Sequence, residues 1–137
     1  AAISACAVGQ QPKPELAMEL LRSMRRQGLK PDVVTYNAAS SACDRGGKWD
    51  WVLELLASMQ QHDLMPDLLT YTAGINACLM GHQSKLAVEL FQAIHQQVIM
   101  PDAITYNLAI TACEQSRQPE RALEIFQAMQ QQVFTNF

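Results

Sequence analysis

The sequence lacks the motifs that mark most enzymes and membrane proteins. Only 17% of its 137 residues are charged and 7% are aromatic. No apolar run approaches the ~20 residues that a membrane-spanning helix needs, so we predict no such span. A glycine-rich phosphate loop, an HExxH zinc motif and the HxE and PCxxC pattern of zinc deaminases are all missing. Because His62, His82 and His95 also have no regularly placed Cys, Ser or Asp partner, we predict neither an enzyme nor a cofactor site.

Positive charge is also scarce. Ten Lys and Arg stand against 13 Asp and Glu, which gives a net charge of −3. Cations that neutralise phosphates supply much of the affinity of nucleic-acid-binding proteins, so this balance weighs against a tight complex with nucleic acid. The densest group of cations is interpreted as the solvated outer face of a helix: Arg22, Arg25, Arg26 and Lys30.

The four cysteines are spread out rather than paired. Three of them, Cys43, Cys78 and Cys113, follow an alanine at intervals of 35 residues, and the fourth is Cys6. A zinc site or disulfide framework would need closer pairs such as CxxC. Stacked helices also lie ~8–10 Å apart, beyond the ~7 Å between Cα atoms that a disulfide tolerates. The pattern therefore predicts small buried packing residues that stay reduced.

What the sequence does contain is an internal repeat. The dipeptide Pro-Asp occurs at residues 31–32, 66–67 and 101–102, and similar text follows each time: VVTYNAASSAC, LLTYTAGINAC and AITYNLAITAC. Residues 1–6 resemble residues 38–43, so we expect the chain to begin inside a repeat and to be a piece of a longer array. We predict one array, divided into a partial repeat at 1–32 and units at 33–67, 68–102 and 103–137.

Each unit shows the apolar spacing of two helices. In the unit 33–67, the first helix carries Tyr36, Ala39 and Cys43 on one face, and the second carries Val52 and Leu55 in an amphipathic stripe. Pro119 suits the start of a second helix. In the linkers, Pro ends the second helix of one unit, and Asp can cap the first helix of the next. We expect the tyrosines of the first helices to pack between neighbouring units.

The period of 35 and the phrase around Thr-Tyr together resemble the pentatricopeptide repeat family. A tetratricopeptide array would have a period of ~34 and a Trp-x-x-Leu-Gly signature, and the sequence has neither. The resemblance covers essentially the whole chain. It implies an all-α fold, a right-handed α-α superhelical solenoid, with the first helices along its concave surface. It also implies single-stranded RNA as the ligand, at one nucleotide per repeat.

In that family the fifth and the last residues of a repeat select the base, and the second residue packs against it. Carried over, the resemblance pairs Asn37 with Asp67 for uracil and Thr72 with Asp102 for guanine, a U-G preference read 5′ to 3′. The base-selecting candidates are Asn37, Asp67, Thr72, Asp102, Asn107 and Asp32. The base-packing candidates are Val34, Leu69 and Ile104, and the phosphate candidate is Arg45.

Structural alternatives exist for these residues. The aspartates serve as N-caps in any such solenoid, whether or not they also select bases. Asn37 and Asn107 are polar residues that an exposed first turn also accommodates, and the threonine of each TY pair is interpreted as mainly structural. The code is incomplete at both ends: the partner of Asp32 lies before the chain begins, and the last unit closes without Pro-Asp.

Two functions remain open at this point. The first is a sequence-selective RNA-binding module of a mitochondrion or plastid, acting in processing, stability, editing or translation of transcripts. The second is a protein-binding scaffold or accessory subunit of a large organellar complex, with the groove unused by RNA. The acidic balance favours the second, since the first helices up to their cysteines contain no Lys or Arg. The Gln-rich segments 60–61, 96–97 and 130–132 are compatible with it.

Overall fold

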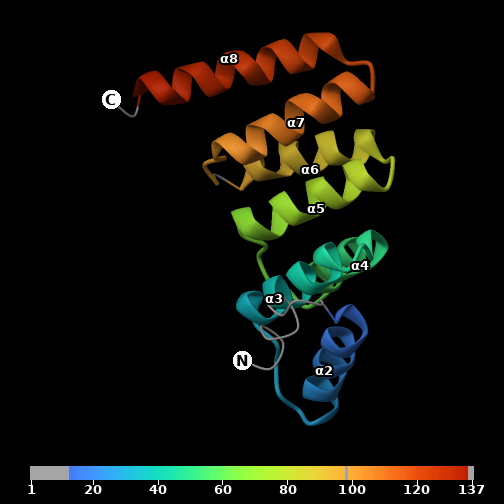
Figure 1. The fold of residues 1–137 in the computed structure, drawn as a ribbon. Helices are drawn as coiled ribbons and strands as arrows, with labels where there is room; N and C mark the ends of the chain where they lie inside the picture. Colours follow the sequence, from blue (N-terminus) through green and yellow to red (C-terminus); the bar gives the residue numbers. More distant parts are fainter. Residues whose placement is uncertain (1–12, 98, 136–137) are drawn as a thin grey trace.

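The computed structural model describes residues 13–97 and 99–135, with side chains up to residue 132. All regular structure in this part of the chain is α-helical (Figure 1). The first helices of the three units are α3 (Val33–Arg45), α5 (Leu68–Met80) and α7 (Ala103–Gln115). The second helices are α2 (Pro14–Arg26), α4 (Trp49–Gln61), α6 (Ser84–Gln96) and α8 (Pro119–Thr135).

Aspartate side chains start all three first helices. Asp32, Asp67 and Asp102 have extended backbone, and their carboxylates accept hydrogen bonds from the backbone N–H groups three residues later, at 2.9, 3.0 and 2.9 Å. These bonds satisfy N–H groups that have no partner inside the helix. The capping role predicted from Pro-Asp is confirmed.

Left-handed turns connect each first helix to its second helix. The turn residues Gly47, His82 and Arg117 have φ angles of 73°, 60° and 58° and are spaced by 35 residues. In the first of these turns the Lys48 N–H donates to the Cys43 carbonyl at 2.8 Å, and the equivalent bond recurs in the other two. This is the helix C-terminal closure that glycine adopts most easily, so His82 and Arg117 hold it at a conformational cost.

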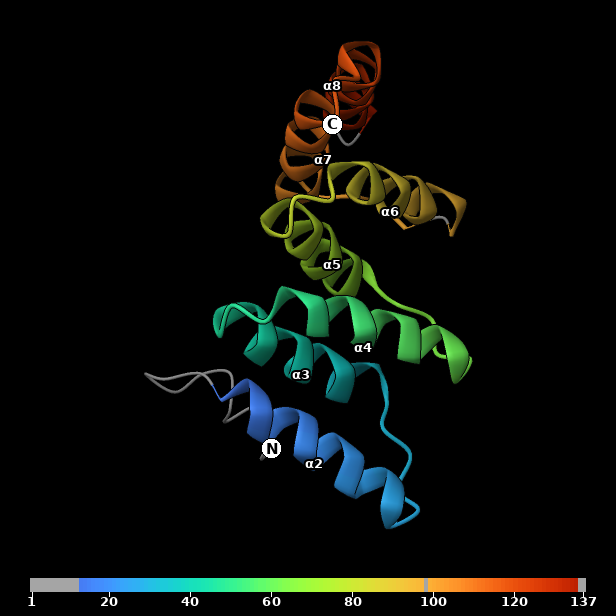
Figure 2. The same ribbon diagram turned by 90° about the vertical axis from the view of Figure 1, so that its right-hand side faces the viewer.

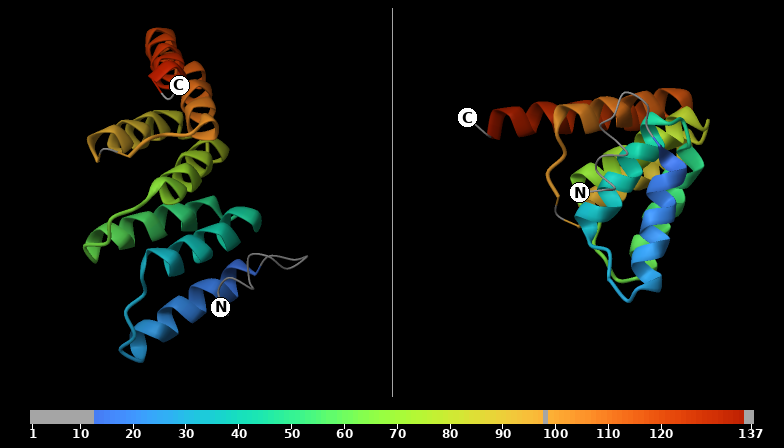
Figure 3. Two further views of the ribbon diagram at one scale, coloured as in Figure 1. Left: turned by 90° about the vertical axis from the view of Figure 1, so that its left-hand side faces the viewer. Right: turned by 60° about the horizontal axis from the view of Figure 1, so that its bottom comes forward.

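The helices stack in chain order from α2 to α8 (Figures 1 and 2). Each helix packs on the next, and the first helices also pack on one another, α3 on α5 and α5 on α7. Within the described residues no two second helices approach as closely, so the first helices form the tighter layer of a curved stack. The linkers between units lie along one edge and the turns within units along the other (Figure 3, left).

The core runs along this stack. Tyr36 and Tyr71 are fully buried, and the ring of Tyr106 lies 5.6 Å from that of Phe91 in the preceding unit, as expected for tyrosines that pack between units. Val52 and Leu55 of α4 are also buried, as their stripe predicts. α8 has 17 residues, whereas the other helices have 13. The prediction that Pro ends the second helices is wrong, because α2 and α4 end at Arg26 and Gln61, five residues before the Pro, where the left-handed residues Gly28 and Asp63 turn the chain. Among the described residues, no helix is both long and apolar enough to cross a membrane.

Candidate functional site

Three aliphatic side chains stand exposed in equivalent places. Val34, Leu69 and Ile104 are the second residues of α3, α5 and α7, and they are 73%, 64% and 64% exposed. Because these helices pack side by side, the three residues form a row along the starts of the first helices. A regular row of exposed aliphatic side chains suits flat apolar groups inserted between neighbouring units. The structure thus places all three base-packing candidates on an accessible surface.

Asn37 of α3 is in direct contact with Asp67, the N-cap of α5. The Asn37 Nδ2 group donates to Asp67 Oδ1 at 3.1 Å and to Oδ2 at 3.2 Å. Asn37 lies in the second turn of α3, and Asp67 caps the adjacent α5, so the packing of α3 on α5 brings them together. The two residues that the family resemblance pairs are therefore neighbours in space although 30 positions separate them in sequence.

Thr70 is a third member of this cluster, and the sequence had suggested only a structural role for it. Its hydroxyl donates to Asn37 Oδ1 at 2.6 Å and lies 2.8 Å from Asp67 Oδ1. It also accepts the backbone N–H of Asp67 at 3.2 Å, which completes a capping box. The amide of Asn37 is thus held on one side by a carboxylate and on the other by a hydroxyl.

Thr72 and Asp102 are linked only through the hydroxyl group of Thr105. The Thr72 hydroxyl lies 2.7 Å from the Leu68 carbonyl and 3.0 Å from the Thr105 hydroxyl. Thr105 in turn donates to Asp102 Oδ1 at 2.6 Å. Threonine has a shorter side chain than asparagine, so it bonds to its own helix and to the capping threonine and makes no direct hydrogen bond to the aspartate.

The remaining base-selecting candidates lack a described partner of this kind. Asp32 caps α3, but the fifth residue of its own repeat would lie before Ala1. Asn107 is exposed on α7, and the residue that would pair with it, Phe137, lies outside the described residues. These two assignments, like those of the four residues above, remain predictions.

Arg45, the phosphate candidate, is exposed at the opposite end of α3 from the row of aliphatic residues. The equivalent positions on α5 and α7 hold Met80, which is half-exposed, and Gln115. Next to Arg45, the carboxylate of Asp44 accepts a hydrogen bond from Asn76 Nδ2 of α5 at 3.0 Å. Of these three equivalent positions, only the one on α3 has a cation, and it lies beside a carboxylate.

The capping aspartates carry negative charge near neutral pH. The Thr35 N–H lowers the pKa of Asp32, and the Thr105 hydroxyl is the main group that lowers the pKa of Asp102. Burial raises the pKa of Asp67, but hydrogen bonds from Thr70 and Asn37 outweigh it, so its pKa is also below the ordinary value. A ligand at this site therefore meets fixed hydrogen-bond acceptors.

The three described cysteines do not lie on the surface that carries the candidate site residues. Cys43, Cys78 and Cys113 are buried and free, which confirms their packing role, whereas Cys6 lies outside the described residues. Burial raises the pKa of Cys43 and of Cys78 to about 11, so both stay protonated at neutral pH. Within 13–97 and 99–135, no three His, Cys, Asp or Glu side chains converge as metal ligands.

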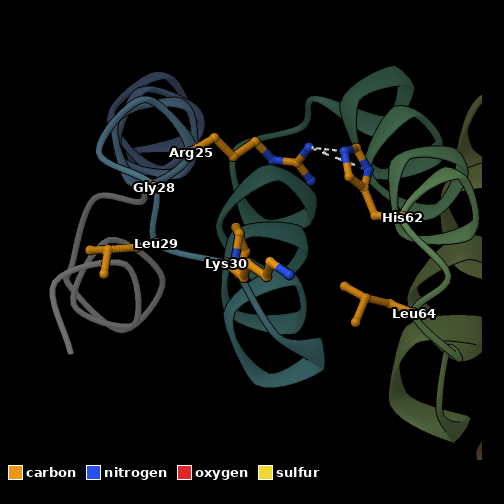
Figure 4. Close-up of a pocket in the computed structure, with 7 residues that line it drawn as sticks. Arg25, Gly28, Leu29, Lys30, His62 and Leu64 are labelled. Carbon is orange, nitrogen blue, oxygen red and sulfur yellow. Dashed lines mark hydrogen bonds between the residues drawn. The ribbon is translucent and has the colours of Figure 1, made fainter.

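A separate cavity of about 460 Å³ lies at the linker edge, between the ends of α2 and α4 (Figure 4). Arg25 reaches across it to the ring of His62, donates to Ser58 Oγ at 3.3 Å and lies 5.5 Å from the ring centre of Tyr36. Arg25 is thus a half-buried link between three helices, which the interpretation as a solvated face did not anticipate. The cavity is lined by Arg25, Gly28, Leu29, Lys30, Pro31, His62 and Leu64.

Family models match nearly the whole chain. A model described as a pentatricopeptide repeat domain matches residues 3–48, 19–81 and 54–115, and a model of the single PPR repeat matches residues 104–132. No curated protein sequence matches the chain.

Solved structures have the same fold. The PPR domain of Arabidopsis thaliana protein-only RNase P 1, in complex with tRNA, has a TM-score of 0.82 at 11% identity, over 96% of this chain and 68% of that one. The pentatricopeptide repeat protein PPR10 with an 18-nt psaJ RNA element has a TM-score of 0.70 at 22% identity, over 96% of this chain and 19% of that one. PPR10 from maize gives 0.56 at 25% identity, over 96% and 18%. The predicted all-α repeat solenoid is confirmed, and the chain spans about a fifth of PPR10.

Proposed function

The chain belongs to the pentatricopeptide repeat family, and from this premise we propose that it binds single-stranded RNA along α3, α5 and α7, with one nucleotide per repeat. The observation that carries the proposal is the cluster of Asn37, Asp67 and Thr70 beside the exposed side chains of Val34 and Leu69. Two relatives of the same fold were solved with RNA, which supports the same ligand class here.

The chemistry of the first cluster suits a pyrimidine. An asparagine amide has two N–H donors and an oxygen with two lone pairs. In the structure Asp67 takes up one N–H and Thr70 takes up one lone pair, so one donor and one acceptor remain for a ligand. The base edges of uracil and of cytosine both offer a complementary acceptor and donor. We propose uracil at this position because the family resemblance implies it.

The chemistry of the second cluster differs. Thr72 has a single hydroxyl proton and two internal acceptors for it, the Leu68 carbonyl and the Thr105 hydroxyl. Toward a ligand it therefore presents lone pairs, and the Asp102 carboxylate adds a second acceptor. Guanine offers two adjacent donors, the N1–H and the N2 amino group. We propose guanine here, so the two units read U-G from 5′ to 3′.

The expected affinity is low for this length of chain. Two bases, held between Val34, Leu69 and Ile104, contribute roughly 1 to 3 kcal/mol each by analogy with stacked bases. A total of about 4 kcal/mol corresponds to a Kd near 1 mM. Measurable selectivity therefore requires high protein concentration and low salt, because phosphate contacts weaken as salt rises.

Fluorescence anisotropy with labelled single strands tests the proposal. Strands that differ only in one dinucleotide, U-G against U-U, C-G and A-A, should bind in the order that the two clusters predict. Asn37→Ala should abolish the preference for U. Asn76→Ala is the matched control, because it removes another Asn-to-Asp hydrogen bond that links α3 to α5. Equal binding of all strands by the wild-type protein would refute base selection.

A protein-scaffold function is the second candidate. It is favoured by the cation-poor surface: α5 and α7 contain no Lys or Arg, and Met80 stands exposed where α3 has Arg45. Failure to bind any RNA at low salt, together with a reproducible protein partner from organelles, would favour it. A mitochondrial or plastid location is likewise proposed from the family resemblance. Imaging of the full-length coding sequence fused to a fluorescent protein tests that location, and a purely cytosolic signal would contradict it.

A further inference from the structure

We infer that Thr70 and Thr105 are specificity-positioning residues. Each one lies in the unit that follows a base-selecting residue and sets which hydrogen-bonding groups that residue shows to the base. The inference rests on the proposed RNA-binding function and deepens it. Neither threonine faces the ligand, because Thr70 is 2% exposed and Thr105 is fully buried. They act through Asn37 and Thr72.

Thr70 fixes the orientation of the Asn37 amide. Its hydroxyl donates to Asn37 Oδ1 at 2.6 Å, while Asp67, which only accepts, receives Asn37 Nδ2 from the other side. If the amide turned over, its oxygen would face the Asp67 carboxylate and the two acceptors would repel each other. The two neighbours together therefore hold the amide with one donor and one acceptor in defined places.

Thr105 performs the opposite task for Thr72. Its own proton is directed to Asp102 Oδ1 at 2.6 Å, which leaves its lone pairs to face the Thr72 hydroxyl at 3.0 Å. The Thr72 proton has two inward acceptors, the Leu68 carbonyl at 2.7 Å and the Thr105 oxygen at 3.0 Å, so lone pairs point to the ligand. The same buried residue type thus donates to an asparagine in one unit and presents an acceptor to a threonine in the next.

Thr35 provides a control within the chain. It makes the same capping contacts, with its N–H and hydroxyl at 2.9 and 2.8 Å from Asp32 Oδ1. No base-selecting side chain contacts it in the described residues. A substitution at Thr35 therefore measures the cost of losing the capping hydroxyl alone.

The experiment compares Thr70→Val, Thr105→Val and Thr35→Val in the full chain. Valine keeps the shape and removes the hydroxyl. Thr70→Val should lower the preference for U about fivefold, the equivalent of one hydrogen bond, and leave the preference for G unchanged. Thr105→Val should lower the preference for G and leave the preference for U unchanged, with a loss smaller than fivefold because the Leu68 carbonyl still accepts the Thr72 proton. Thr35→Val should change neither. Thr70→Ser, which retains a hydroxyl, should restore the preference.

A second measurement needs no RNA. In ¹H–¹⁵N spectra, Thr70→Val should shift the side-chain amide resonances of Asn37 and leave those of Asn76 in place. If Asn37→Ala loses selectivity but Thr70→Val keeps it, with unchanged Asn37 resonances, the inference is wrong and the proposed function stands. If all three valine variants weaken every RNA equally, the threonines are structural only. Absence of any RNA binding by the wild-type protein would refute the proposed function, and this inference with it.

Discussion

Asp67→Ala and Asp102→Ala should differ in their effect on stability, although both aspartates cap 13-residue helices through the same hydrogen bond. Loss of an N-cap costs about 1 kcal/mol, and both variants should show that loss. Only Asp67 also holds Asn37, through contacts at 3.1 and 3.2 Å. A hydrogen bond to a charged group contributes about 1.5 to 3 kcal/mol when well shielded. Because Asp67 is largely exposed, solvent screening reduces this to about 1 kcal/mol.

Urea denaturation followed by circular dichroism at 222 nm measures both losses. We expect Asp67→Ala to lower the free energy of unfolding by about 2 kcal/mol and Asp102→Ala by about 1 kcal/mol. A double-mutant cycle of Asp67→Ala with Asn37→Ala should give a coupling energy of about 1 kcal/mol. Equal losses for the two alanine variants, with a coupling energy near zero, would show that the Asn37 contact stabilises nothing and that the amide is not held before RNA binds.

Three further predictions concern pH, backbone conformation and thiol reactivity. The pKa values of Asp67 and Asp102 are lowered in the folded state, so the stabilisation they provide is present above the unfolded pKa near 3.8 and should be lost as pH falls below about 4. Urea midpoints from pH 3 to 7 measure this loss. Higher stability in acid would contradict it. Arg117→Gly relieves a φ of 58° and should raise the free energy of unfolding by up to about 1 kcal/mol, whereas Glu124→Gly inside α8 should lower it by about 1 kcal/mol. Because the pKa of Cys78 is raised to about 11, its thiol should react with Ellman's reagent only after urea unfolding, measured in a Cys6→Ser variant. Rapid labelling of that variant in its native state would show that the helix stack opens.

The sequence predicts the helices well because their ends are specified locally. The Asp of each Pro-Asp pair fixes the start of a first helix, because its side chain accepts the backbone N–H three residues later. The same hydrogen bond recurs every 35 residues. The neighbours of Asn37 follow from the stacking of successive units, which the family resemblance supplied. The role of Arg25 does not follow from either source, since its contacts to Ser58 and His62 depend on how α2 and α4 lie at the linker edge.

The hydrogen-bond partners of the Thr70 and Thr105 hydroxyl groups could not be predicted from the sequence. Thr70 and Thr105 occupy equivalent positions in identical Thr-Tyr pairs. Thr70 donates to an amide oxygen, which only accepts, whereas Thr105 faces a hydroxyl and gives its own proton to Asp102. These contacts follow from the packing of α3 on α5 and of α5 on α7.

In both units the buried threonine and the aspartate stay the same, while the residue that faces the base differs: Asn37 in one and Thr72 in the next. The substitution Thr72→Asn tests whether this one residue selects the base. An asparagine at position 72 would face Thr105 and Asp102 as Asn37 faces Thr70 and Asp67, so Thr105 should turn its proton from Asp102 to the new amide oxygen. The second base should then change from G to U, and U-U should replace U-G as the preferred dinucleotide in anisotropy measurements. Thr105→Val added to Thr72→Asn should weaken the new preference about fivefold. If Thr72→Asn still prefers G, the base is selected by something other than the groups that the two threonines and the aspartate present.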